Sequence, residues 1–191
     1  GMLAELENWM FPPAPNHLDS PRASIRAACT PKTDEAEPGL HTLNVNFIVK
    51  RPRTGDRKKS LTNISDLIVR AAHEQELFPL EDWAFIEWLV ENYAEEANDD
   101  STLVLNGQEL LTWLVRWGSR NQLQSTENGH PIHFHGGITE LVPDLQNGKS
   151  DLTFTHRLRL PDGSLKPLGD AVFFSGQPTM VLVDGVFYFL R

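Results

Sequence analysis

Two histidines in the second half of the sequence have a spacing that can bind a metal. His133 and His135 are separated by one residue, so on a β-strand both side chains would project from the same face. Imidazole nitrogens arranged in this way are ligands that transition metals accept in sheet-based sites. Glu140 or a distant aspartate would have to complete the site. The sequence leaves open a metal-binding domain, with hydrolysis as one chemistry that the metal could support, and equally two surface or structural histidines.

A second candidate is the concentration of positive charge in residues 50–59. This segment holds six basic residues and one acidic residue, a net charge of +5; the whole chain carries −9, so the remainder carries −14. Lysine and arginine side chains neutralise phosphates and release counterions without reading base sequence. We therefore predict contact with nucleic acid or with an acidic protein surface; a solvated loop that pairs with the acidic body is the alternative. The cations are Lys50, Arg51, Arg53, Arg57, Lys58 and Lys59.

Motifs that define common catalytic sites are absent from the sequence. It contains no phosphate-binding glycine loop and no nucleophile elbow. Gly136-Gly137 do not open a helix, so a bulge or a tight turn explains them better. His73 lacks the second histidine of a zincin motif, because position 77 is Leu77. We expect a chain that is not an enzyme and that requires no cofactor.

The elements that would position these residues follow from apolar periodicity. In the first two thirds of the chain, apolar residues recur mostly at helical spacing. Ser60 or Thr62 would cap the first helix, and Gly118 stands where a glycine would end the third. The expected elements are a strand at 41–50, helices at about 60–75, 81–97 and 107–117, and a short strand at 102–105.

After Gly118 the apolar pattern changes to that of strands separated by turns. Asp184-Gly185 between two apolar runs predicts a tight hairpin. The expected strands span about 130–145, 152–160, 171–175, 180–183 and 186–190. The fold class is therefore α+β, with a three-helix middle segment packed with an antiparallel β-rich C-terminal half.

The N-terminal part is predicted to lack regular structure. Six prolines lie within residues 12–38, and proline disfavours both helix interiors and central strands. Residues 1–40 should form a proline-rich arm with a short helix near its start. A single α+β domain should follow at 41–191, helical at 60–118 and β-rich at 119–191. Cys29 would be a thiol in the flexible arm.

Composition indicates the cellular compartment of the protein and the role of its tryptophans. A single cysteine excludes an internal disulfide, which fits a reducing, cytoplasmic compartment. No apolar run approaches the roughly 20 residues of a membrane helix, so we expect no membrane partner. Four tryptophans on or beside the helix stripes are predicted to form the core, rather than a platform for stacking bases. They are Trp83, Trp88, Trp113 and Trp117.

Several short motifs are similar to those of one known class of protein. They are Phe47-Ile-Val-Lys-Arg-Pro-Arg-Thr-Gly-Asp-Arg57, Arg70-Ala-Ala-His-Glu-Gln-Glu-Leu-Phe78, Trp83-x4-Trp88-Leu, Gly107-x-Glu109-Leu-Leu-x-Trp113-Leu, and the stretch from Leu165 to Leu190. Together they resemble the N-terminal accessory region of bacterial Swi/Snf-type ATPases, which are helicase-like DNA translocases. The resemblance covers about residues 41–191.

The resemblance implies an accessory or interaction domain of an ATP-dependent DNA translocase. The sequence has no Walker A lysine loop and no acidic Mg²⁺-binding motor motif. A motor domain would accordingly follow Arg191 in the same polypeptide, and its partners would be that motor and DNA. A stand-alone structural scaffold, kept soluble by its acidic surface, is the other class that the sequence leaves open.

Overall fold

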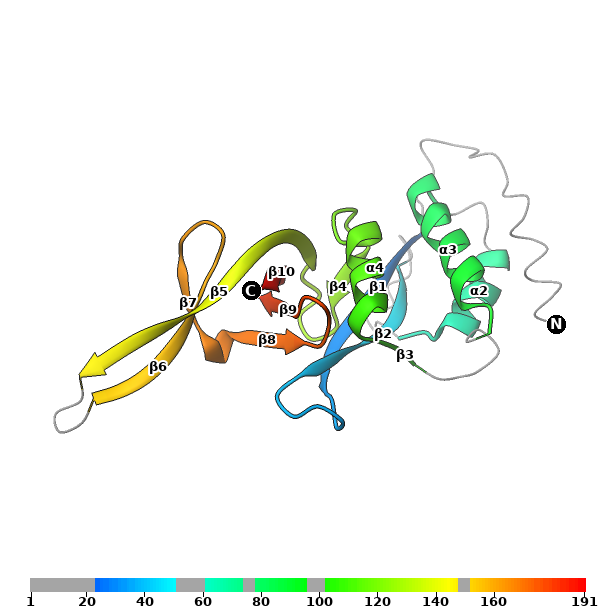
Figure 1. Ribbon diagram of the computed structural model, residues 1–191. Helices are drawn as coiled ribbons and strands as arrows, with labels where there is room; N and C mark the ends of the chain where they lie inside the picture. The colour runs from blue at the N-terminus through cyan, green and yellow to red at the C-terminus, as the bar shows by residue number, and fades with distance from the viewer. Residues whose placement is uncertain (1–22, 51–60, 74–77, 96–101, 148–151) are drawn as a thin grey trace. The chain divides into compact units, whose positions relative to one another are not determined.

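The fold is α+β, as predicted, with helices in the middle of the chain and strands dominating its C-terminal half (Figure 1). The computed structural model describes residues 23–50, 61–73, 78–95, 102–147 and 152–191. The expected N-terminal helix lies outside the described residues. Contacts divide the chain into two compact units. The first comprises the described parts of Gly1–Cys29 and Asn44–Leu103, and the second comprises Thr30–Leu43 and the described parts of Val104–Arg191.

The first unit combines two helices with parts of two strands. Helix α2 (Ile64–His73) buries residues 64, 67, 68 and 71, which recur at helical spacing and form one apolar stripe. Its first turn is capped by Asn63, whose Oδ1 accepts a hydrogen bond from the backbone N–H of Asp66 at 2.8 Å. The prediction of Ser60 or Thr62 as the cap is thus wrong. Helix α3 (Leu80–Tyr93) begins directly after Pro79.

Strand β1 (Ser24–Thr33) contradicts the prediction that residues 12–38 lack regular structure. The prolines of this segment bracket the strand, and Pro31 lies close to its end. Between them, Ile25 and Ala27 are fully buried, and Cys29 is buried as well. The short run without proline is therefore long enough to form a strand. Cys29 lies in this strand and not in a flexible arm.

The second unit contains helix α4 (Gly107–Trp117) and most of the sheet. Strand β2 (His41–Lys50) confirms the predicted strand and contributes its first residues here. The remaining strands are β3 (Leu103–Leu105), β4 (Leu123–Ser125), β5 (His133–Asn147), β6 (Leu152–Arg159), β7 (Leu165–Pro167), β8 (Ala171–Phe174), β9 (Met180–Val183) and β10 (Val186–Leu190), and a 3₁₀ helix η3 (Leu168–Asp170) precedes β8. Their order is β4-β1-β2-β8-β9-β10-β5-β6-β7, and β3 pairs with β2.

Among the strand pairings of the described residues two are parallel, and one of them, between β5 and β10, lies in the half that was predicted to be antiparallel. Strand β2 pairs with β8 in parallel through His41 and Phe174, and β10 pairs with β5 in parallel. A parallel pair needs a long crossover, and strands β6 to β9 supply it between β5 and β10. The predicted hairpin at Asp184-Gly185 is confirmed, because both residues have positive φ (49° and 76°) and join the antiparallel strands β9 and β10.

Large side chains fill the cores of both units. Trp83 and Trp88 are buried in the first unit, and Trp113 and Trp117 in the second. These tryptophans are core residues, as predicted, and no described one offers an open ring face for a base. A second cluster in the C-terminal sheet gathers aliphatic side chains from β6 and β9. Its buried members are Leu158, Leu160, Val181 and Val183.

Helix α4 ends where Gly118 approaches the sheet. A Cβ atom at Gly118 would lie 2.5 Å from the carbonyl oxygen of Leu114 and 2.5 Å from Cβ of Phe134. The backbone N–H of Phe134 donates to the carbonyl of Gly118 at 2.9 Å. With φ at −68°, this residue is not in the left-handed conformation of a C′ glycine. Glycine is needed here for close packing, and not for backbone freedom.

Candidate functional site

The predicted basic contact begins at the end of strand β2, in the first unit. Lys50 is the last residue of this strand and is exposed. The other predicted contact residues lie outside the described residues: Arg51, Arg53, Arg57, Lys58 and Lys59. Of the six predicted contact residues, the structure therefore describes Lys50, and it also describes the residues on either side of the basic segment.

The two flanks of the basic segment are joined by backbone hydrogen bonds. The N–H of Phe47 donates to the carbonyl of Thr62, and the N–H of Thr62 donates to the carbonyl of Phe47, both at 2.7 Å. Phe47 is fully buried and its ring lies 6.2 Å from that of Phe85 on α3. Asn63 then caps α2. The described flanks of the segment are thus held together in the first unit.

The predicted metal ligands His133 and His135 lie on β5 and are exposed. Strand β5 bulges here, because three residues (135–137) lie between Phe134 and Ile138, opposite the single residue between Phe187 and Phe189. The prediction of a bulge at Gly136-Gly137 is confirmed.

The bulge also changes what His135 can do. Its Nδ1 accepts a hydrogen bond from the N–H of Gly137 at 3.1 Å, and its ring lies 5.3 Å from that of Tyr188. Glu140, the predicted third ligand, instead pairs with Arg159 and Arg191. Within the described part of the chain, no group of three or more histidine, cysteine, aspartate or glutamate residues could hold a metal. The described residues therefore bring no third ligand to the histidine pair.

Charged groups also surround Tyr188. Burial of its hydroxyl raises the pKa of Tyr188, and the carboxylates of Asp162 and Asp184 add to this effect. Lys166 pairs with Asp184 at 3.2 Å and opposes the shift. The phenol is protonated at neutral pH, as in an ordinary tyrosine, and can donate a hydrogen bond.

Hydrogen bonds also lower the pKa of an aspartate in the turn between β6 and β7. The hydroxyl and the backbone N–H of Ser164 both donate to Asp162, at 2.6 and 2.9 Å. These two bonds lower the pKa of Asp162. By accepting both bonds, its carboxylate stabilises the turn between β6 and β7.

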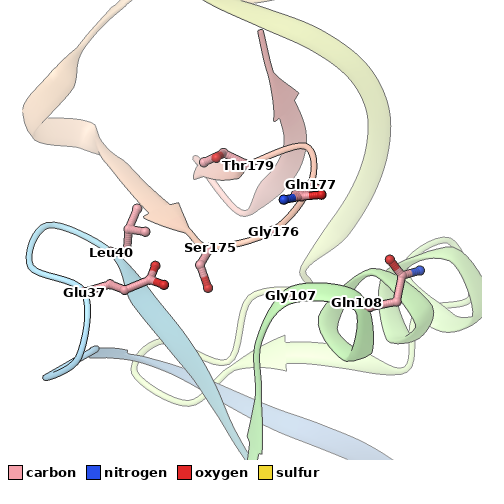
Figure 2. A pocket seen from close by; sticks show the side chains of 8 residues that line it. All are labelled: Glu37, Leu40, Gly107, Gln108, Ser175, Gly176, Gln177 and Thr179. Atoms are coloured by element: carbon pink, nitrogen blue, oxygen red, sulfur yellow. The ribbon is translucent and has the colours of Figure 1, made fainter.

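A pocket of about 510 Å³ in the second unit was not predicted (Figure 2). Three segments form it: the turn between β1 and β2, the start of α4, and the loop between β8 and β9. The N–H of Gly107 donates to the carbonyl of Ser175 at 3.0 Å and joins two of these segments. The lining residues are Glu37, Leu40, Gly107, Gln108, Ser175, Gly176, Gln177 and Thr179. Only the acidic run at Asp34-Glu35 and Glu37 could have marked it, because the other segments are distant in sequence.

In comparisons with known proteins, no protein-family model, no curated protein and no solved structure matches the chain. Among the described residues, no helix has the length and apolar character needed to cross a membrane.

Proposed function

We propose that this chain is a non-catalytic interaction domain of a larger helicase-like, DNA-dependent ATPase, and that residues 50–59 contact nucleic-acid phosphates. The charge of the segment supports this function, since it carries +5 while the remainder of the chain carries −14. Cations concentrated in this way attract a phosphate backbone even when the protein as a whole is acidic. The motif resemblance described above points to the same class of protein.

The observation that carries the proposal is the pairing of Phe47 with Thr62. Their backbones exchange two hydrogen bonds, so the described flanks of the basic segment are held together in the first unit. The six cations lie in sequence between these two flanks, and each phosphate that they neutralise releases counterions.

The proposal is tested by salt-dependent binding of fluorescent duplex and single-stranded DNA. The native chain should bind DNA, and the logarithm of the affinity should fall linearly with the logarithm of the salt concentration. A variant with Arg57→Gln, Lys58→Gln and Lys59→Gln should bind more weakly. For duplex DNA its salt slope should be smaller by up to about 2.7, at about 0.9 for each lost phosphate contact.

A matched control removes the same number of charges elsewhere. Lys32, Arg70 and Arg116 are exposed and lie outside the basic segment. Replacing all three with glutamine should leave the DNA salt slope unchanged. An equal loss in this control, or a native chain without salt-sensitive DNA binding, would overturn the proposal. Binding to polyglutamate but not to DNA would instead identify an acidic protein surface as the partner.

A further inference from the structure

We propose that the pocket between the β1–β2 turn, the start of α4 and the β8–β9 loop binds the cationic side chain of an arginine or lysine in a partner peptide. This site is independent of the basic segment, since every lining residue lies in the second unit. The charge of the lining, its hydrogen-bonding groups and the size of the pocket all favour such a ligand.

The lining carries negative charge. Glu37 is its one charged residue, and none of the described lining residues is a cation. The same turn adds Asp34 and Glu35, and Glu109 lies in the first turn of α4. The lining and its surroundings would therefore repel an anionic ligand, whereas a cation would be attracted.

The start of α4 does not reverse this preference. A helix N-terminus carries partial positive charge because its first N–H groups lack partners within the helix. The N–H of Gly107 already donates to the carbonyl of Ser175. Glu109, in the first turn, offsets the remaining dipole.

The hydrogen-bonding groups of the pocket suit a ligand with several N–H donors. Gln108 and Gln177 offer amide oxygens, and Ser175 offers a hydroxyl oxygen (Figure 2). The carboxylate of Glu37 provides a charge-assisted acceptor. Leu40 adds an apolar surface for the methylene groups of a lysine or arginine side chain. A guanidinium or an ammonium group on an alkyl stem satisfies all of these features.

The size of the pocket favours a residue within a peptide over an isolated ion. A volume of about 510 Å³ lies in the range of about 300–1,000 Å³ that is typical of organic ligand sites. A bare cation would leave most of this space to water. An arginine with its flanking peptide bonds fills more of it and brings further N–H groups to the acceptors.

The test compares two nearly isosteric probes that differ in charge. N-acetylarginine amide and N-acetylcitrulline amide are titrated into the ¹⁵N-labelled full chain, followed by the amide signals of Gly107, Gly176 and Gln108. The arginine probe should give saturable shifts at these signals, and the citrulline probe should bind about tenfold more weakly, as expected for the loss of a charge-assisted hydrogen bond. Equal binding of the two probes, or shifts elsewhere in the chain, would overturn the assignment.

Two variants separate direct contact from the general acidic field. Glu37→Gln should weaken binding of the arginine probe by about five- to tenfold. The matched control, Glu35→Gln, removes the same charge from the same turn but does not line the pocket, and should change affinity by less than about twofold. If the two variants weaken binding equally, the acidic turn attracts the probe without a specific binding site. Gln108→Ala, on an exposed helix residue, serves as a second variant and should also weaken binding.

Discussion

The carboxylate of Asp82 on α3 accepts a hydrogen bond from the backbone N–H of Ile25 on β1 at 3.3 Å. Asp82 is only 2% exposed, and its other oxygen lies 3.5 Å from the guanidinium of Arg26. The buried acid therefore connects a helix to a strand whose residues are distant in sequence. Within the first unit, this contact determines where the start of β1 lies against α3.

Removal of the Asp82 carboxylate should destabilise the first unit. Asp82→Ala leaves a buried N–H without this acceptor and a cation without its partner, so the free energy of unfolding should fall by roughly 2–3 kcal/mol. Glu87→Ala, on an exposed position of the same helix, is the control and should change stability by less than about 0.5 kcal/mol. Urea unfolding measures both. Equal values would show that the buried contact contributes nothing.

A methyl group at Gly118 should be costly for a purely steric reason. Gly118→Ala places Cβ 2.5 Å from the carbonyl oxygen of Leu114 and 2.5 Å from Cβ of Phe134, and overpacking of this kind costs about 1–3 kcal/mol. Gly169→Ala is the matched control, because a Cβ there meets no atom within 4 Å. Thermal unfolding should show a lower Tm for the first variant only. If the Tm of the Gly118→Ala variant is unchanged, the end of α4 can move away from β5.

The backbone pairing of Phe47 with Thr62, which joins the flanks of the basic segment, should matter for DNA binding. Thr62→Pro removes the N–H that donates to Phe47, while Thr62→Val keeps it. The proline variant should lose about 1–3 kcal/mol of stability and bind fluorescent DNA more weakly, because one of the two hydrogen bonds that hold the flanks of the basic segment together is lost. The valine variant should retain its affinity for DNA. If both variants bind as the native chain does, the pairing is structural only.

Alkaline pH should weaken the second unit through Tyr188. Its pKa in the folded chain lies above the ordinary value of 10.0, so the folded state holds the phenolic proton more tightly than the unfolded state. The resulting stability is complete below about pH 10 and is lost as pH rises through the folded pKa. Urea midpoints at about pH 8 and pH 10.5 should therefore fall further for the native chain than for Tyr188→Phe. Identical falls would assign the alkaline loss to other groups.

Local sequence signals predicted the helices and the hairpin. The stripe of α2 and the pair Asp184-Gly185 depend on neighbouring residues, so their patterns appear directly in the sequence. Strand β1 was missed because proline content outweighed the short run from Ala23 to Thr30. Strands β4 and β7 were not predicted, because each has three residues of which only the leucine is strongly apolar, whereas the three residues of the predicted β3 are all apolar.

The candidate sites were harder to predict, because their geometry depends on distant contacts. The charge of residues 50–59 is visible in the sequence, whereas the pairing of Phe47 with Thr62 is not. The spacing of His133 and His135 suggested a metal pair, but the bulge gives the Nδ1 of His135 a local partner. The pocket beside Glu37 needs a backbone hydrogen bond between Gly107 and Ser175, which no local pattern encodes.

Strand β10, the last strand of this sequence, lies between β9 and β5 and not at an edge of the sheet (Figure 1). On the ribosome, Thr139 of β5 emerges well before Val186, and at roughly 5–20 residues per second the delay is roughly 2–10 s. During this interval the edge of β5 that will receive β10 has unsatisfied backbone groups and an exposed Phe134. Nascent chains should therefore be most prone to aggregation, and most dependent on chaperones, just before synthesis of β10 is complete.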